Sequence, residues 1–559
     1  MDTQVTIVGA GPVGLTAAMD LARRGIDVTV VESRTDDEPA DAKCNTVASR
    51  TMEVFRQLGI ADAVRAAGLA DDFPTDVIFT TAVSGEELTR IVLPSRAERF
   101  GPDGRSAPGY IDSHWQTPEP VVRISQLYLN PILLEHARTF GRITIVPETT
   151  VLRYDDAADE VTVHCENRSG AARTITSRYL IGCDGGTSGI RKQMGVQLLG
   201  DAELSRSRSS LVRCPAIKDL FPGKPAWMSW VVNPRQTGTV VAIDGDELWL
   251  VHRTMGLNRS YESVDLDQSM RDVLGVDDSF QWEVVHHQDW TARRLVAGRF
   301  RSDNVFICGD AAHIWIPFAG YGMNAGIADC TNLTWMMAAV LNGEADQQLL
   351  AAHERERHPI TEQVSQLAMG KALEYMDKAQ NRRIPKVLES RNFIGRMVRR
   401  RLGRQLYDIN WPQFGCEGLN FGYYYDDSPV ICYDDSTAPG YDMGHAEPST
   451  VPGCRLPHFW MPDGTSLYDR LGMAYTMLNF SGAPVDASFV DAFIGAGLPL
   501  DVLDVAERPV RYQHRFVLGR TDQHVVWRGD ELPDDLETFT RRLVGQGTDN
   551  KTSGREEAA

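Results

Sequence analysis

The feature that most constrains this chain is a glycine-rich turn between a short apolar segment and a helical pattern near the N-terminus. Residues 5–8 (VTIV) predict a buried strand, because a short apolar run leads directly into glycine. Residues 15–24 have helical spacing, and Gly25 stands where a helix ends. Residues 28–31 (VTVV) predict the next strand. Together they predict a β-α-β unit.

The turn has the pattern Gly-x-Gly-x-x-Gly, which is typical of a dinucleotide site. The first glycine permits the tight turn, the second lets a pyrophosphate approach the backbone, and the third allows close packing of helix on strand. The acidic residue that ends the second strand is placed to accept hydrogen bonds from a ribose. The predicted cofactor-binding residues of this unit are Gly9, Gly11, Pro12, Val13, Gly14 and Glu32.

Composition excludes several functions. The formal net charge of -19 disfavours nucleic-acid binding, because a strongly acidic chain repels phosphate. No segment approaches the roughly 18 consecutive apolar residues of a membrane helix. Residues 1–4 (MDTQ) lack the cationic start of a signal peptide. We therefore expect a cytoplasmic protein that binds neither nucleic acid nor membranes.

The nine cysteines predict no metal site and no disulfide framework. Their number is odd, their spacing is irregular and no C-x-x-C pattern occurs. We interpret them as reduced thiols, most of them in the core.

Two further motifs narrow the type of dinucleotide. Residues 179–185 (YLIGCDG) are followed by 188–191 (SGIR), and residues 305–313 (VFICGDAAH) are followed by Pro317 and by 320–324 (GYGMN). With the glycine-rich turn, these segments resemble the flavin-binding motifs of class A FAD-dependent aromatic hydroxylases, in the order of that family. Near the C-terminus, segments such as PGCRLP and LGRTDQHVVWR resemble the last domain of the branch that includes phenol and aromatic polyketide hydroxylases.

The resemblance implies an α/β fold with a Rossmann-like FAD-binding domain of the p-hydroxybenzoate hydroxylase type, a β-sheet substrate domain and a C-terminal thioredoxin-like domain. The implied boundaries are 1–75, 120–195 and 290–400 for the discontinuous FAD-binding domain, 76–119 and 196–289 for the substrate-binding domain, 440–545 for the thioredoxin-like domain and 546–559 for a disordered tail. Without C-x-x-C, we expect the last domain to act in structure or in dimer contacts. A homodimer is the assembly that such contacts would support.

The resemblance also assigns residues to the cofactor. Asp310 would bond a ribityl hydroxyl, Arg123 and Gln126 would contact the FAD backbone, and Lys43 would lie near the pyrophosphate, with Arg50 a weaker candidate. The remaining residues implied to bind FAD, many of them through backbone against the ring, are Asp184, Gly309, Pro317, Gly320, Gly322, Met323 and Asn324.

Residues near the reacting ring are harder to assign. Trp315 and Pro317 precede the flavin-facing glycines and are the candidates for the catalytic pocket. His313 is a candidate base, although a histidine in this position is more often a packed structural residue. Aromatic residues of the 200–290 region, such as Trp227, Trp230 and Trp249, and His252 could line the substrate site, but aromatic residues in strands more often belong to the core.

The implied reaction is hydroxylation of a phenolic or polycyclic aromatic substrate through a flavin C4a-hydroperoxide, with NADH or NADPH and O2 as cosubstrates. Only one strand-glycine-helix unit occurs, so the nicotinamide has no domain of its own and its identity is open.

Three alternatives remain open. A Baeyer-Villiger or epoxidising flavin monooxygenase, acting on a natural-product intermediate, would use the same flavin motifs. A flavin oxidase or reductase would insert no oxygen. An inactive flavoprotein could bind a partner through its last domain, but the intact glycine, aspartate and arginine positions disfavour it. The substrate, regiochemistry, catalytic base and oligomeric state stay undetermined.

Overall fold

The N-terminal segment forms the centre of a parallel sheet. A computed structural model describes residues 1–35, 38, 45–99, 110–255, 257, 261, 265–315, 320–379 and 384–546. In it, β1 pairs in parallel with β2 on one side and with β9 on the other. The strands of this sheet, in spatial order, are β15 (Arg301–Ser302), β16 (Val305–Ile307), β9 (Tyr179–Gly182), β1 (Val5–Val8), β2 (Val28–Val31) and β5 (Ile143–Val146).

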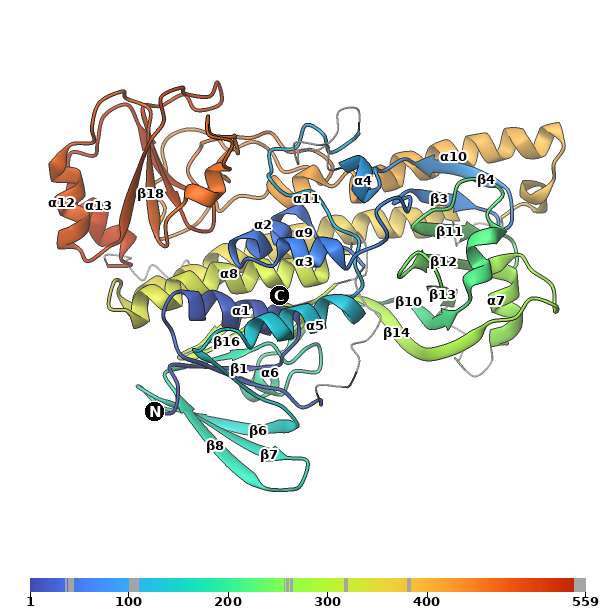
Figure 1. Cartoon of the computed structure of the whole chain (residues 1–559), viewed down its shortest axis with the longest axis horizontal. Coiled ribbons are helices and arrows are strands. Elements are labelled where there is room, and N and C mark those ends of the chain that lie inside the picture. Colours follow the sequence, from blue (N-terminus) through green and yellow to red (C-terminus); the bar gives the residue numbers. More distant parts are fainter. Residues whose placement is uncertain are drawn as a thin grey trace, which may run out of the picture.

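Both faces of this sheet are covered, which explains its near-continuous apolar strands. Residues of α1 (Pro12–Arg23) and α8 (Gly322–Leu341) pack on one face in the largest core cluster. The opposite face packs against α6 (Gly189–Gln193) and a three-stranded antiparallel sheet. That sheet, at the bottom of Figure 1, consists of β6 (Thr149–Asp156), β7 (Val161–Asn167) and β8 (Ala172–Ser177).

Further helices surround α1 and α8. The helices α2 (Ser49–Gln57), α3 (Ala61–Ala66) and α5 (Gln126–Ala137) share a core with residues of α1 and α8. Their position places the segments around residues 46–48 and 123–126 beside the start of α8.

A second, eight-stranded sheet draws on two separate parts of the chain. The strands from residues 77–91 join those from 198–297, because β3 pairs with β11. This sheet lies at the right of Figure 1 and carries α7 (Leu266–Leu274). Its order is β17 (His313–Ile314), β14 (Glu283–Ala297), β10 (Leu198–Arg213), β13 (Leu248–Met255), β12 (Thr237–Ala242), β11 (Met228–Val232), β3 (Val77–Thr80) and β4 (Glu87–Ile91).

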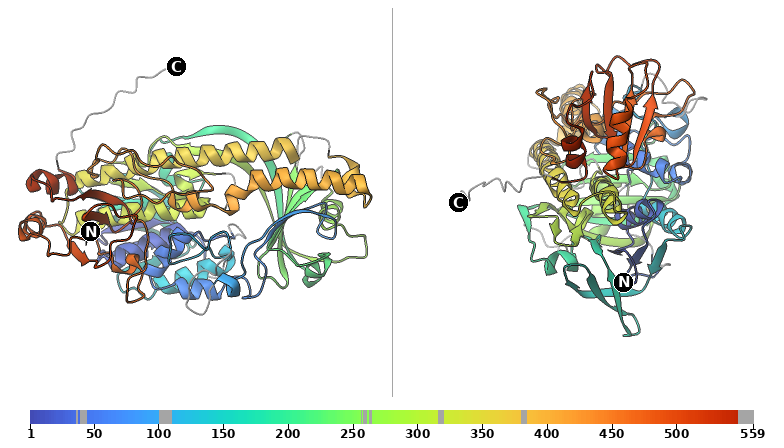
Figure 2. Two further views of the ribbon diagram at one scale, coloured as in Figure 1. Left: turned by 90° about the horizontal axis from the view of Figure 1, so that it is seen from above. Right: turned by 90° about the vertical axis from the view of Figure 1, so that its left-hand side faces the viewer.

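Two long helices connect the ends of the molecule. As Figure 2 shows from above, α9 (Ala351–Ala379) and α10 (Phe393–Phe414) run along its length. The short helices α4 (Arg96–Arg99) and α11 (Glu417–Phe421) lie near α10 in Figure 1.

The C-terminal unit, red in Figure 1, has a β-α-β segment followed by a β-hairpin and a helix. In its four-stranded sheet β19 and β18 are parallel, whereas β20 is antiparallel to both β18 and β21. The elements are β18 (Tyr475–Asn479), α12 (Ala487–Gly495), β19 (Leu500–Asp504), β20 (Phe516–Arg520), β21 (Val525–Gly529) and α13 (Leu536–Leu543).

Within the described ranges, no helix is long and apolar enough to cross a membrane. The eight cysteines in these ranges are all free thiols. Among the same residues, no group of histidine, cysteine and carboxylate side chains could hold a metal ion.

Candidate functional site

The three glycines of the first turn differ in what surrounds them. A Cβ at Gly9, whose φ is +105°, would lie 2.4 Å from the carbonyl oxygen of Cys183, and a Cβ at Gly14 would lie 2.0 Å from that of Gly9. A side chain is therefore excluded at both. At Gly11, the residue before α1, a Cβ would meet nothing within 4 Å. Gly9 and Gly14 therefore allow the backbone of the turn to pack closely. The space next to Gly11 is open and lies at the N-terminus of α1, the positive end of the helix dipole.

Glu32 supports this turn. Its Oε2 atom accepts a hydrogen bond from the backbone N–H of Ala10 at 2.7 Å, and its Oε1 atom accepts one from the N–H of Arg34 at 2.9 Å. The carboxylate therefore fixes the glycine-rich loop to the end of β2. Its side chain retains some exposed surface, so it can also accept from a ligand.

The segment after β9 closes around the same turn. Asp184 accepts hydrogen bonds from the backbone N–H groups of Gly189 and Ile190 through Oδ2, so this atom caps α6. Its Oδ1 atom is enclosed and has no partner among the described residues. The buried Arg191 donates to the carbonyl oxygen of Ala311 at 2.9 Å. It ties this segment to the one that follows β16.

Asp310 stands out because its carboxylate is free. It lies in a short 3-10 turn (Gly309–Ala311) after β16, is exposed, and has no hydrogen-bond partner in the described part of the chain. Gly309 has φ +62°, and a Cβ there would approach Val13 of α1 at 3.0 Å. The close approach of Gly309 to the Val13 side chain, at the start of α1, therefore places Asp310 beside the first turn.

A buried carboxylate that sequence reasoning did not single out holds this region together. Asp329 of α8 accepts hydrogen bonds from Nε2 of His313, Nε of Arg357 and the backbone N–H of Gly309. No local motif marks Arg357, because it lies on a different helix, α9. His313, the predicted candidate base, has no exposed side-chain surface.

The start of α8 is clamped by Asn324. Its Oδ1 atom accepts from the backbone N–H of Ala48, and its Nδ2 donates to the carbonyl oxygens of Thr46 and Gly320. Gly320 has φ +61°, and a Cβ at Gly322 would meet nothing within 4 Å. The helix N-terminus therefore presents open backbone next to the segment of residues 46–48.

Gln126 and Arg123 also lie beside the start of α8 and the segment of residues 46–48. Gln126 donates to Sδ of Met323 at 3.5 Å, and Arg123 donates to Oγ1 of Thr46 at 2.6 Å. The guanidinium of Arg123 also lies 4.0 Å from the ring centroid of Trp227. Trp227 is 2% exposed, and both Trp227 and Trp249 belong to the core of the eight-stranded sheet.

An aromatic cluster adjoins the start of α8. Trp315 stacks on Tyr321 with ring centroids 5.8 Å apart, and both belong to a cluster that includes Trp290 of β14 and Tyr441. Two polar atoms of this cluster, Nε1 of Trp315 and the Tyr441 hydroxyl, are enclosed without a hydrogen-bond partner among the described residues. Pro317 and Lys43 lie outside the described residues, so their predicted roles stay predictions.

These residues fit a flavin dinucleotide. The backbone is open at Gly11 and Gly322, where phosphates and a ring would approach, and the two sites lie at the N-termini of α1 and α8. The Asp310 carboxylate and Oδ1 of Asp184, neither of which has a partner within the described ranges, can accept hydrogen bonds from ligand hydroxyls. Most of the residues predicted from the motifs are thus brought to one region.

Comparison with known proteins agrees with this geometry. A family profile described as an FAD binding domain matches residues 2–368. The phenol 2-monooxygenase of Pseudomonas sp. (strain EST1001) is 28% identical, over 96% of this chain and 91% of its own length. A putative polyketide hydroxylase of Streptomyces halstedii is also 28% identical, over 94% of this chain and 93% of its own.

Solved structures show the same relationship over nearly the full length. RebC soaked with chromopyrrolic acid, with bound 7-carboxy-K252c, has a TM-score of 0.86 and 30% identity, covering 97% of this chain and 99% of RebC. The ternary complex of aklavinone-11 hydroxylase with FAD and aklavinone has a TM-score of 0.79 and 25% identity, covering 98% and 99%.

Proposed function

Because the chain belongs to the FAD-binding-domain family and is an FAD-dependent aromatic monooxygenase, we propose that it hydroxylates a phenolic or polycyclic aromatic substrate with O2 and NADH or NADPH. The observation that carries the proposal is the open backbone at Gly11 and Gly322, together with the Asp310 carboxylate, which has no partner among the described residues. A site shaped for a flavin thus adjoins an aromatic cluster.

FAD, when bound, supplies the redox and oxygen-transfer chemistry. The contribution of the chain is binding and electrostatics. The N–H groups at the start of α1 would hold the phosphates, and Asp310 would accept a hydrogen bond from a hydroxyl of the ribityl chain. The positive N-terminus of α8 would favour negative charge on a ring bound there. The Asn324 side chain holds this end of α8 against residues 46–48 through hydrogen bonds to their backbone.

The substrate packs against the aromatic cluster that contains Trp290, Trp315 and Tyr441. Strands β10 and β14 and helix α9 also contribute apolar side chains to this cluster. It can shield a reacting ring from water, which a hydroxylase needs to avoid unproductive release of peroxide. Unpartnered polar atoms on Trp315 and Tyr441 can bond oxygen atoms of the substrate, because a buried polar group without a partner is costly.

His313 acts as a positioning residue in this account. Its Nε2 bonds to Asp329 at 2.7 Å, and its side chain has no exposed surface. A residue that transfers a proton must reach the substrate. The His313 ring instead lies buried against Asp329, the carboxylate that supports the Gly309 turn. Trp315, by contrast, adjoins Tyr321 at the start of α8 and keeps its place in the proposed pocket.

The C-terminal unit is thioredoxin-like in this proposal. Its support is the β-α-β segment followed by a hairpin and a helix, with sheet order β19-β18-β20-β21. No C-x-x-C pattern is present in the sequence, so its role is structural. Formation of a homodimer stays a prediction, which light scattering coupled to size exclusion tests.

The test is aerobic oxidation of NADH and NADPH by the purified protein with a panel of phenols and polycyclic quinones, with product and hydrogen peroxide assayed together. We expect at least one compound to stimulate oxidation and to gain one oxygen atom on its ring. A ring-expanded lactone would instead identify a Baeyer-Villiger enzyme. Peroxide alone, without stimulation by any compound, would contradict the aromatic substrate.

A further inference from the structure

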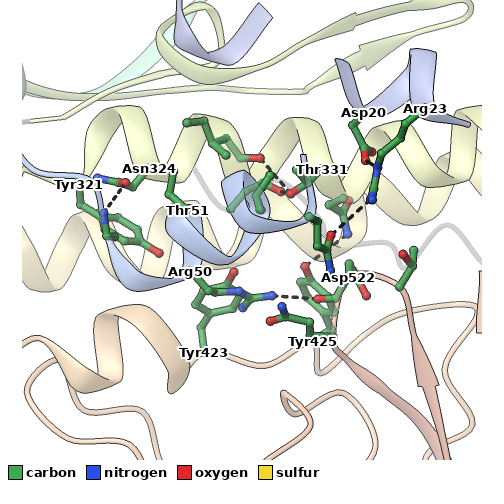
Figure 3. Close-up of a pocket in the computed structure, with 18 of the residues that line it drawn as sticks. Asp20, Arg23, Arg50, Thr51, Tyr321, Asn324, Thr331, Tyr423, Tyr425 and Asp522 are labelled. Atoms are coloured by element: carbon green, nitrogen blue, oxygen red, sulfur yellow. Dashed lines mark hydrogen bonds and ion pairs between the residues drawn. The ribbon is translucent and has the colours of Figure 1, made fainter. Parts of the chain in front are cut away.

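A pocket lies between the FAD-binding part of the chain and the C-terminal unit (Figure 3). Its walls are α1, α2 and α8, the segment with Tyr423 and Tyr425, and the turn between β20 and β21 at residues 521–523. The open space, including the mouth, is about 650 Å³. The pocket adjoins the start of α8 at Tyr321, and neither Gly11 nor Asp310 lines it.

Arg50 of α2 is poorly satisfied in this pocket. Its Nη2 donates to the backbone carbonyl of Asp522 at 3.0 Å, and this is its only hydrogen bond within the described residues. Its Nη1 atom is enclosed without a partner. The guanidinium lies 4.8 Å from the ring centroid of Tyr423 and forms no ion pair with any described residue. Arg50 is only partly buried, but an enclosed donor such as its Nη1 is costly to leave without a partner, so a ligand acceptor at this atom would be favourable.

The carboxylates that line the pocket are already paired. Asp20 binds Arg23 and Arg24 and accepts from the hydroxyl of Thr334. The Asp522 carboxylate binds Arg520, whose side chain is fully buried. Glu53, which does not line the pocket, is bound through Oε1 by Arg455 and by Thr117, and its Oε2 atom is enclosed without a partner among the described residues. None of these carboxylates forms an ion pair with Arg50.

Two phenol groups of the pocket also lack partners. Tyr321 is 6% exposed and Tyr423 is 2% exposed, and neither hydroxyl has a hydrogen-bond partner among the described residues. Burial raises the pKa of Tyr321 well above its usual value, so this phenol stays protonated and can donate. Figure 3 shows Arg50 beside Tyr423, with Tyr321 across the pocket. One guanidinium and two hydroxyl donors therefore line the same space.

We propose that this pocket binds a small carboxylate whose oxygens are held by Arg50. A guanidinium presents a planar fork of donors that matches a carboxylate, and the two phenols can donate to its remaining lone pairs. The apolar side chains of Ala48, Val54 and Ile327 line the pocket and accept a short alkyl body. A bound carboxylate would connect α2 and α8 to the C-terminal unit.

The test is saturation-transfer NMR of the acetate methyl group with the holoenzyme, in a buffer without other carboxylates. We expect a saturable signal with a Kd of about 0.1–10 mM, the range open to a ligand of so few atoms. Tyr423→Phe, which removes one hydroxyl, should raise that Kd at least threefold, and Arg50→Met should abolish the saturable signal. Tyr424→Phe is the matched control, because Tyr424 does not line this pocket, and it should bind acetate like the unmodified protein.

Sodium chloride and phosphate are competitors at constant ionic strength. If neither chloride nor phosphate displaces acetate at less than a tenfold excess over acetate, the result would support a carboxylate site. Displacement by chloride or phosphate at equal concentration would overturn the proposed ligand class. A signal that is unchanged in both Tyr423→Phe and Arg50→Met, or no saturable signal, would overturn the site itself. Because Tyr423→Phe changes a single atom, it decides the question even if Arg50→Met does not fold. None of these outcomes depends on hydroxylase activity.

Discussion

The Nε2 atom of His313 lies 2.7 Å from Oδ2 of Asp329, and neither side chain has exposed surface. The other oxygen of that carboxylate accepts from Nε of Arg357 at 2.9 Å. Burial alone would raise the pKa of Asp329, but the neighbouring His313 and Arg357 lower it below its usual range, so it is charged in the folded protein. This carboxylate connects α8, α9 and the Gly309 turn that carries Asp310.

We expect Asp329→Asn to destabilise the protein and to weaken FAD binding. The change leaves Arg357 buried without its counter-charge, which typically costs about 3–5 kcal/mol. The measurements are the unfolding midpoint and the flavin retained after gel filtration. Asp267→Asn is the control, because Asp267 is exposed and Arg271 keeps its second carboxylate partner, Asp278, so stability should change by about 1 kcal/mol or less. Equal stability and equal flavin content in Asp329→Asn and the control would refute the role assigned to Asp329.

The glycines of the first turn should respond differently to alanine. Gly14→Ala would place a Cβ 2.0 Å from a backbone oxygen, so we expect little folded protein. At Gly11 the space is open and φ is -76°, so Gly11→Ala should fold with an almost unchanged midpoint. Its Cβ would occupy the path of the pyrophosphate, and the Kd for FAD should rise at least tenfold. Unimpaired FAD binding by Gly11→Ala would place the cofactor elsewhere.

We expect Asp310→Asn to weaken FAD binding without lowering the stability of the apoprotein. The carboxylate has no partner among the described residues, so the folded apoprotein loses no contact of its own. A hydrogen bond to a charged group contributes about 1.5–3 kcal/mol, which corresponds to a roughly ten- to hundredfold weaker Kd for FAD. Flavin fluorescence titration of the apoprotein measures this change. If the Kd stayed the same while the melting point fell, Asp310 would be a structural residue.

Buried histidines predict acid sensitivity. Burial lowers the pKa of His353, of His458 and of His524 to about 3. Since the unfolded chain takes up these protons near pH 6.5, stability is present above that pH and is lost as pH falls toward 3, by about 1.4 kcal/mol per pH unit for each histidine. Unfolding in urea at pH 7.5 and pH 5.5 tests this, and His353→Gln should reduce the difference. Equal stability at both pH values would contradict buried neutral histidines.

Local patterns predicted much of the fold. The strands expected at residues 5–8 and 28–31 are β1 and β2 with those bounds, since both runs are apolar and lie in the buried centre of the sheet. The helix expected over residues 15–24 is confirmed as α1, but it begins earlier, at Pro12, because proline is tolerated in the first turn of a helix. It ends at Arg23, and helix ends of this kind are the least certain part of a sequence-based prediction.

Local sequence patterns did not predict the side-chain contacts between segments that are distant in the chain. Asn324 was predicted to meet a ligand through its backbone, and the structure shows that its side chain is committed to residues 46–48 and 320. Asp184 was predicted to bind the cofactor; one of its oxygens caps α6, and the other has no partner among the described residues, so the predicted role stays a prediction. The Asp329–Arg357 pair has no sequence signature, because it is defined by which helices pack together. Arg50 was a weaker candidate for the pyrophosphate, whereas its side chain lines the pocket beside the C-terminal unit.

The central claim is that oxygen from O2 enters an aromatic ring. The direct measurement is mass spectrometry of the product formed under 18O2, with NADH or NADPH and a substrate that stimulates their oxidation. We expect a product two mass units heavier than that formed under ordinary O2, and no label from 18O-water. A product labelled from water, or oxidation of the nicotinamide with an unaltered aromatic compound and stoichiometric peroxide, would contradict it.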